Sequence, residues 1–411
     1  MNRLSLPKDK IKILLLENIH AQAADLFRRH GYRQVEELGE ALDDKNLKAR
    51  IADAHMIGIR SRTQITDSIL AAANKLMAIG CFCIGTNQVD SGSAKLAGIP
   101  VFNAPYSNTR SVAELVLAEA IILLRGVPEK SWLSHEGVWQ KTAAGSHEIR
   151  GKTLGIVGYG HIGTQLSILA EALGMRVVFF DIVEKLALGN AIPVRNFGEF
   201  LSMADIVSLH VPATDLTAGM MGSEHLRSMK KGAILINASR GNVVEIDALA
   251  TCLRDGHLTG AAIDVFPQEP ASPEEPFDSP LQGMKNVILT PHIGGSTLEA
   301  QANIGTEVAD KLVKYSDNGS TLGAVNVVEV ALPPQQGAIR FMHIHRDVPG
   351  VLTKINDVFS SRDINISGQY LRADGEVGYV VTDILGDVDV GMGIRRDLQA
   401  IEGTVRTRFL Y

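Results

Sequence analysis

The sequence is poor in features that define several large classes of protein. Its 411 residues contain only three cysteines, Cys81, Cys83 and Cys252, which offer neither a disulfide framework nor the spacing of a zinc site. No apolar run approaches the roughly 20 residues that span a bilayer, and the run near the N-terminus is too short for a signal peptide. We therefore expect no membrane partner, a reducing cytoplasm, and small buried apolar roles for the cysteines.

The sequence also lacks an excess of basic charge. Lysine and arginine total 40 against 46 acidic residues, so the formal net charge is −6, and long basic runs are missing. This balance argues against nucleic acid as the main partner. The apolar fraction of 45% is ordinary for a globular protein, and a chain of this length is expected to form two or three domains.

Short apolar runs alternate with helical patterns over the first 330 residues. Strands that alternate with helices form parallel sheets with helices on both faces. The sequence therefore predicts an α/β protein. Strands are expected at residues 10–17, 55–60, 76–81, 206–210, 233–237, 260–264 and 287–290, and helices at 21–29 and 111–124.

A different pattern follows the proline-containing stretch at residues 332–337, which is the clearest linker. Four strands and two helices are expected beyond it, in the order βαββαβ of a ferredoxin-like module. The strands are expected at residues 338–345, 364–371, 378–385 and 405–410, and the first helix at 351–359.

The most informative motif is Gly-x-Gly-x-x-Gly at Gly158, Gly160 and Gly163, between a predicted strand and a predicted helix. The first glycine allows a tight turn, the second lets a pyrophosphate approach the backbone, and the third lets helix and strand pack closely. The next strand ends at Asp181, whose carboxylate can bond ribose hydroxyls and repel a 2′-phosphate. A plain turn without ligand is the alternative, but this order of elements favours NAD binding.

Three later segments place polar residues at the ends of predicted strands, where open parallel sheets bind ligands. Singly, Arg240 could be a surface cation, Glu269 a loop charge and His292 a core histidine. Together they could support hydride transfer between NAD and a 2-hydroxy acid. An arginine can hold a carboxylate, a histidine can exchange the hydroxyl proton, and a carboxylate can orient that histidine. This chemistry needs no metal.

These residues match a known family. Over residues 10–330 the chain resembles the D-isomer-specific 2-hydroxyacid dehydrogenases, on the glycine motif and on segments 203–212, 229–241 and 286–295. It looks most like their three-domain branch, which oxidises 3-phospho-D-glycerate with NAD at the first step of phosphorylated serine biosynthesis. The resemblance implies that Arg240, Glu269 and His292 are the catalytic set, with His292 as acid and base.

The same resemblance implies three domains and a set of cofactor residues. A Rossmann-type, doubly wound nucleotide domain would occupy residues 108–295, a discontinuous flavodoxin-like substrate domain residues 1–107 and 296–332, and a regulatory domain residues 338–411. The residues implied to line NAD are Gly158, Gly160, His161, Ile162, Gly163, Asp181, His210, Ala238, Ser239, Arg240, Asp264, His292, Ile293, Gly294 and Gly295.

The substrate residues begin with Arg60, Ser61 and Arg62, which follow an apolar run. Two cations beside a hydroxyl suit a phosphate, although an isolated Arg-x-Arg is more often a solvated loop. The resemblance favours the phosphate and adds Asn108 to this set. It also implies that Trp139 and Lys141 serve a neighbouring subunit's active site. We therefore expect a homo-oligomer, with a tetramer as the predicted form. From the sequence alone, Trp139 could equally be a core aromatic.

The C-terminal module resembles an ACT domain, a regulatory fold that binds amino acids. The resemblance implies that such domains pair between subunits, and that His345, Asp347 and Asn365 bind L-serine as a feedback inhibitor across the paired domains. Related enzymes have an asparagine at the position of Asp347. The aspartate weakens the expectation, because a carboxylate cannot donate a hydrogen bond to the serine carboxylate and repels it. Two alternatives stay open: a dehydrogenase of another D-2-hydroxy acid, and a non-enzymatic NAD-sensing protein similar to a corepressor.

Overall fold

The computed structural model describes residues 6–270, 274–333, 337–385 and 388–411. The chain forms two compact units, one made of residues 1–107 and 301–411 and the other of residues 108–300. The linker expected at residues 332–337 is described only at its ends, because residues 334–336 lie outside the described residues. Within the described ranges, no helix has both the length and the apolar character needed to cross a membrane.

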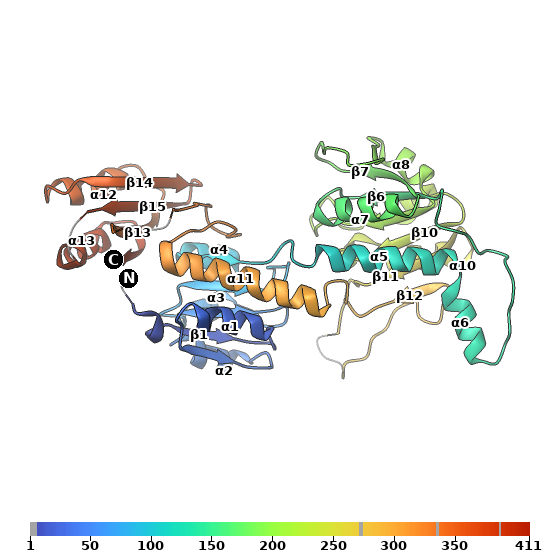
Figure 1. Ribbon diagram of the computed structural model, residues 1–411, viewed down its shortest axis with the longest axis horizontal. Helices are drawn as coiled ribbons and strands as arrows, with labels where there is room; N and C mark the ends of the chain where they lie inside the picture. The colour runs from blue at the N-terminus through green and yellow to red at the C-terminus, as the bar shows by residue number, and fades with distance from the viewer. Residues whose placement is uncertain (1–5, 271–273, 334–336, 386–387) are drawn as a thin grey trace. The chain divides into compact units, whose positions relative to one another are not determined.

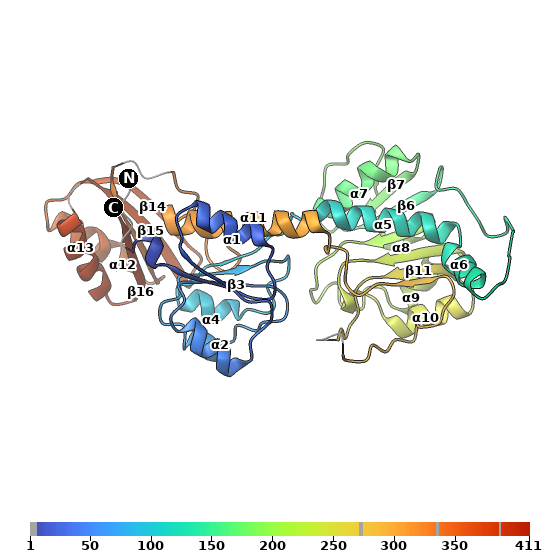
Figure 2. The same ribbon diagram turned by 60° about the horizontal axis from the view of Figure 1, so that its bottom comes forward.

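The first unit contains a five-stranded parallel sheet in the order β2-β1-β3-β4-β5, which is the flavodoxin-like order. Helices α1 and α11 cover one face and α2 and α4 the other (Figure 2). Because both faces are covered, β3 and β4 are buried along their whole length. The elements are β1 (Lys12–Leu15), α1 (Ala21–Arg29), β2 (Gln34–Glu37), α2 (Asp44–Ile51), β3 (Met56–Ile59), α3 (Asp67–Leu70), β4 (Ala78–Cys81), α4 (Ser91–Leu96), β5 (Val101–Phe102) and α11 (Leu298–Asn318).

The second unit contains a seven-stranded parallel sheet in the order β12-β11-β10-β9-β6-β7-β8. The order reverses between β6 and β9, which is the switch point where doubly wound sheets bind ligands. Helices α5 and α7 lie on one face, and α8 and α10 on the other (Figures 1 and 2). The elements are α5 (Thr109–Leu124), α6 (Val127–His135), β6 (Thr153–Val157), α7 (His161–Ala172), β7 (Arg176–Phe180), β8 (Ile192–Pro193), α8 (Phe197–Met203), β9 (Ile206–Leu209), α9 (Ser223–Ser228), β10 (Ala233–Asn237), α10 (Ile246–Arg254), β11 (Leu258–Ile263) and β12 (Val287–Leu289).

A third sheet, antiparallel and four-stranded, has the order β14-β15-β13-β16 and belongs to the first unit. With its two helices it forms the βαββαβ arrangement expected from the sequence. The α/β class, the doubly wound nucleotide fold and the C-terminal module are thus confirmed. Its elements are β13 (Ile339–Arg346), α12 (Val351–Ser360), β14 (Ile366–Ala373), β15 (Val377–Ile384), α13 (Val388–Ala400) and β16 (Thr404–Leu410).

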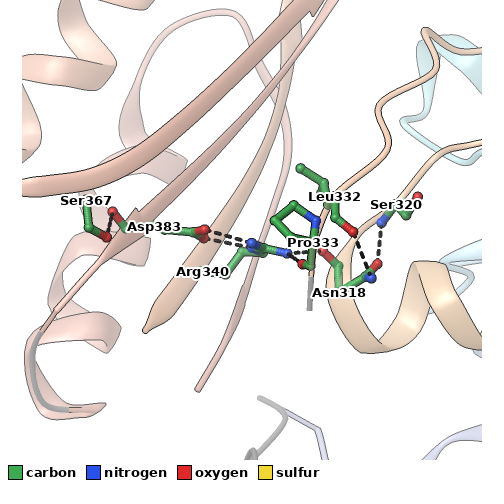
Figure 3. Close-up of polar contacts among 7 residues, drawn as sticks. All are labelled: Asn318, Ser320, Leu332, Pro333, Arg340, Ser367 and Asp383. Atoms are coloured by element: carbon green, nitrogen blue, oxygen red, sulfur yellow. Dashed lines mark hydrogen bonds and ion pairs between the residues drawn. The ribbon is translucent and has the colours of Figure 1, made fainter. Parts of the chain in front are cut away.

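A buried arginine ties this third sheet to the end of α11 (Figure 3). Arg340 on β13 is 1% exposed, and its guanidinium donates two hydrogen bonds of 2.7 Å to Asp383 on β15. Its Nη1 also donates to the backbone oxygens of Asn318, at 3.1 Å, and Pro333, at 2.9 Å. The buried charge of Arg340 is therefore neutralised within the sheet by Asp383. The remaining donors of the guanidinium bind the backbone on either side of residues 319–332.

The cysteine prediction holds for two of the three residues. Cys81 and Cys252 are buried, but Cys83 is only half-buried. Cys83 lies just beyond the end of β4, where its thiol donates to the backbone oxygen of Gly85 at 3.1 Å. A core position was therefore the wrong expectation for Cys83, because the chain has already left the sheet there.

Candidate active site

The three glycines of the nucleotide motif differ in the space around them. A Cβ atom at Gly158, which has a φ of +90°, would collide with the backbone of His210, and one at Gly163 would collide with the backbone of Gly158. A Cβ at Gly160 would meet no atom within 4 Å. Gly158 and Gly163 thus serve the packing of the turn, whereas the space beside Gly160 is open, as an approaching diphosphate requires.

Asp181 joins the end of β7 to the glycine turn. Its Oδ2 accepts a hydrogen bond of 2.9 Å from the amide of Tyr159, and its Oδ1 accepts one of 2.9 Å from the amide of Val183. Each carboxylate oxygen keeps a further lone pair. Asp181 therefore fixes the loop around the expected adenosine site, in addition to any bond with a ribose.

The other expected cofactor residues surround the same edge of the sheet. His161 begins α7 and is exposed, while Ile162 and Ala238 are half-buried and Ser239 is buried. His210 follows β9 and shares a hydrogen bond of 2.8 Å with Ser208 through Nε2, while its buried Nδ1 has no partner among the described residues. Burial lowers the pKa of His210 to about 4, so the ring is neutral at pH 7.

The three expected catalytic residues come together in the second unit. His292 Nδ1 and Glu269 Oε2 are 2.8 Å apart, and Glu269 Oε1 accepts a hydrogen bond of 3.1 Å from the amide of Phe266. Arg240 lies beyond β10, close enough for its charge to act on both groups. Its Nη1 donates to the oxygen of Ser239 at 2.6 Å, which leaves its other nitrogens for a ligand.

Asp264 at the end of β11 builds the turn that carries His292. Its buried carboxylate accepts hydrogen bonds from the Thr290 hydroxyl at 2.6 Å and from the amides of Ile293 and Gly294 at 2.8 Å. His292 has a φ of +54°, which is left-handed and rare for a residue with a side chain. The bonds to Asp264 hold this strained conformation, as is often found at functional sites.

The Glu269–His292 pair has shifted pKa values. Burial opposes the charge on Glu269, but the hydrogen bonds from His292 and the Phe266 amide and the charges of His292 and Arg240 hold its pKa below the ordinary value. The hydrogen bond to Glu269 raises the pKa of His292 above its ordinary value, against the effect of partial burial. A histidine whose pKa is raised by a carboxylate partner in this way can take up and release a proton near neutrality.

The expected substrate residues lie in three places. Arg60, Ser61 and Arg62 follow β3 in the first unit, where Ser61 and Arg62 are exposed and Arg60 is half-buried. Asn108 is buried in the second unit, with its amide packed against Gly295. Lys141 lies in the exposed segment after α6.

The expected effector residues lie at opposite ends of the antiparallel sheet, because His345 and Asp347 are at the end of β13, beside the start of α12, and Asn365 precedes β14 at the other end, so one chain does not bring the three together. His345 is buried, and its Nδ1 bonds to the oxygen of Arg346 at 2.7 Å. Asp347 is exposed and accepts a hydrogen bond of 3.1 Å from the amide of Gly375, in the turn between β14 and β15. That turn is held to α4 by Lys95, which forms ion pairs with Asp374 at 2.7 Å and Glu376 at 2.9 Å. Asn365 is exposed just before β14.

The sequence analysis missed three buried polar residues near these sites. Glu119 on α5 is 2% exposed, and burial together with the charge of Asp264 raises its pKa to about 8. Glu17 and Gln88 are buried beside the Arg60–Arg62 loop. The available signal for Glu119 was a carboxylate on the apolar face of a helix, and an acid placed there is kept only when it is neutral or paired.

Two family profiles match the chain. The D-isomer specific 2-hydroxyacid dehydrogenase NAD binding domain matches residues 117–294, and the AHAS small subunit-like ACT domain matches residues 341–406.

Similar proteins extend the match to the whole chain. The D-3-phosphoglycerate dehydrogenase of Escherichia coli (strain K12) is 59% identical over 411 residues, covering 100% of both chains. That of Haemophilus influenzae is 57% identical over 410 residues, again covering 100% of both. The solved structure of the D-lactate dehydrogenase of Aquifex aeolicus, complexed with NAD and lactic acid, has a TM-score of 0.65 and 25% identity, and covers 74% of this chain and 95% of that one.

Proposed function

Because the chain belongs to the D-3-phosphoglycerate dehydrogenases of the D-isomer-specific 2-hydroxyacid dehydrogenase family, we propose that it oxidises 3-phospho-D-glycerate to 3-phosphooxypyruvate. The observation that carries the mechanism is the 2.8 Å contact between His292 and Glu269, beside Arg240. The chain is an NAD-dependent dehydrogenase, and the substrate and the residue roles given below are our proposal.

NAD fits the residues of the second unit. The open space beside Gly160 can admit its diphosphate at the start of α7, Asp181 can meet its ribose hydroxyls, and the unpartnered Nδ1 of His210 lies at the same edge of the sheet. When bound, NAD supplies the hydride acceptor.

His292 is the proton acceptor in this proposal. With Nδ1 held by Glu269, the free Nε2 of a neutral imidazole can take the substrate's hydroxyl proton. The imidazolium formed is then stabilised by the glutamate charge. Arg240 binds the substrate carboxylate and draws charge from the adjacent oxygen as the carbonyl forms.

Arg60 and Arg62 bind the phosphate in this proposal. Both follow the carboxyl end of β3, where parallel sheets bind ligands, and each guanidinium can bond two phosphate oxygens at once. A substrate without phosphate gives these cations no anionic group to bind, so these residues favour phosphoglycerate over other D-2-hydroxy acids.

A homotetramer in the cytoplasm is part of the proposal. Helix α6 has no buried residue, and the segment after it stands away from the sheet (Figure 1). Trp139 in that segment is 86% exposed, close to the exposed Val138. Apolar side chains that extend together into solvent are typical of an interface, so we assign this arm, with Lys141, to contacts with a second copy.

Feedback inhibition by L-serine, bound at His345, Asp347 and Asn365 across the paired C-terminal domains of two subunits, completes the proposal. The Asp347 carboxylate can pair with the ammonium group of an amino acid. It already accepts the Gly375 amide, in the turn that Lys95 ties to the substrate domain. A ligand that changes this bond would therefore act on a contact shared by the two domains, provided that it binds the two arrangements unequally.

The test is the rate of NADH formation with 3-phosphoglycerate, with unphosphorylated D-glycerate, and with added L-serine. We expect turnover of the phosphorylated substrate, much weaker turnover of D-glycerate, and inhibition by serine. Equal turnover of both acids would refute the phosphate assignment, while unchanged rates with serine, together with no heat of serine binding, would refute the effector assignment alone.

A further inference from the structure

The loop that carries Arg60 and Arg62 is bonded to a buried acid from another strand. Glu17, which follows β1, is 3% exposed. Its Oε1 accepts hydrogen bonds from the amides of Arg60 at 3.1 Å and Thr63 at 2.9 Å, and its Oε2 accepts one from the amide of Arg62 at 3.0 Å. Three backbone amides of the loop thus point at one carboxylate, which leaves those amides unavailable to any other anion.

The conformation of Glu17 itself is unusual. Its φ is +62° and that of Asn18 is +53°, so two neighbouring residues with side chains lie in the left-handed region. Such strain persists where the surrounding structure compensates for it. Here the compensation is visible as the three hydrogen bonds to the loop and two backbone bonds, from the Glu17 amide to Glu40 and from the Asn18 amide to Leu38.

Glu17 is ionised despite its burial. Burial opposes the charge, but the hydrogen bonds from the amides of Arg62, Thr63 and Arg60 lower the pKa of Glu17. The Nε of Arg62 lies 3.9 Å from Oε2. The carboxylate therefore cancels part of the positive charge of the loop and attracts the Nε of Arg62, while half of that side chain stays exposed.

A second buried residue holds the loop from the opposite side. The Nε2 of Gln88, beyond β4, donates to the backbone oxygen of Arg60 at 2.6 Å and to that of Gly85 at 3.2 Å. Both backbone polar atoms of Arg60 are therefore hydrogen-bonded, the nitrogen to Glu17 and the oxygen to Gln88. The loop is held by residues that follow β1 and β4, the two neighbours of β3 in the sheet.

We propose that Glu17 is a positioning residue for the phosphate of the substrate, acting through the Arg60–Arg62 loop. Because Glu17 occupies the amides of Arg60, Arg62 and Thr63, those amides are unavailable to the phosphate, and the positions of the two guanidinium groups that recognise it depend on the bonds to Glu17. Gln88 supports the same loop to a lesser degree, since it makes one bond to it. This inference rests on the proposed role of Arg60 and Arg62.

The experiment compares Glu17→Gln with Glu36→Gln, a control on β2 of the same sheet whose carboxylate forms an exposed ion pair with Arg50. A glutamine keeps one acceptor oxygen but turns its NH₂ group toward loop amides, so part of the loop is released. We expect KM for 3-phosphoglycerate to rise on the order of tenfold, because one charged hydrogen-bond acceptor is lost, while kcat and KM for NAD stay within about twofold. The control leaves all three unchanged.

A double-mutant cycle with Arg62→Ala separates positioning from a general loss of structure. If Glu17 acts through Arg62, Glu17→Gln raises KM much less in the Arg62→Ala background than in the wild type. Equal effects in both backgrounds, or a fall in kcat matching the rise in KM, would overturn the proposal.

If Glu17→Gln fails to fold, Gln88→Met provides the test, with a smaller rise in KM expected and no change in KM as the opposing result. The parent protein is measured first. A parent without activity on 3-phosphoglycerate refutes the proposed function, whereas an active parent with an unaffected Glu17→Gln variant refutes this inference only.

Discussion

Replacing Glu269 by glutamine tests the catalytic pair most directly. His292 must be neutral to accept the hydroxyl proton, so kcat/KM rises with pH through the pKa of His292, which Glu269 raises. Two unit charges 4 Å apart interact by about 1 kcal/mol in water and about 4 kcal/mol near a protein surface. Because the His292 side chain is 53% exposed, we take about 1.4 kcal/mol, which corresponds to roughly a tenfold change in rate when the charged pair is lost.

Glu269→Gln should therefore move the acid limb of the kcat/KM profile to lower pH. The alkaline plateau should fall by roughly tenfold, less than the loss expected from removing the base itself. The loss of kcat/KM relative to the parent enzyme should then be smallest at acidic pH, where His292 of the parent is already protonated. Rates of NADH formation at low substrate concentration across the pH range measure this, with the exposed Glu224→Gln in the same unit as control. An acid limb that does not move would show that Glu269 does not set the ionisation of His292.

Three further predictions concern the other groups. His292→Ala should lower kcat by about 10²–10⁴-fold with unchanged NAD affinity in a fluorescence titration, and near-normal turnover would remove this histidine from the mechanism. Asp181→Ala should narrow the preference for NAD over NADP in paired kcat/KM measurements, and should also lower Tm because the Tyr159 amide loses its acceptor; equal use of both cofactors by the parent would contradict the role of Asp181. Asp347→Asn should strengthen serine inhibition, since the repulsion of the serine carboxylate is removed, and an unchanged dose–response curve would count against binding at that position.

The elements that the sequence predicted well have strong local periodicity. Helix α1 has the predicted bounds, residues 21–29, and β10 has the predicted residues 233–237, because each places apolar side chains toward a core at a regular spacing. Strand β2 was missed. It lies at the sheet edge with mostly exposed residues, so it has no apolar pattern to read, and its place depends on pairing with β1.

The same distinction applies to the candidate site. The glycine motif and Asp181 were predictable because turn, helix and strand follow one another within a short segment. Glu17 was not, because the amides that it binds lie 43 to 46 residues away. In a sequence, a buried loop acid resembles a solvated one, and only the convergence of strand ends in the parallel sheet distinguishes them.

The contacts of Arg340 determine where the C-terminal domain can be separated from the rest of the chain. A fragment that starts at residue 337 would carry the buried guanidinium without the oxygens of Asn318 and Pro333, and unpaired buried donors cost about 1–3 kcal/mol each. It would also lose Val330 and Leu332, which pack with Met342 and Tyr379. The unit that could be exchanged between enzymes, by engineering or in evolution, therefore begins at the end of α11 and not at the linker, and a transplanted regulatory domain would need to bring residues 318–333 with it.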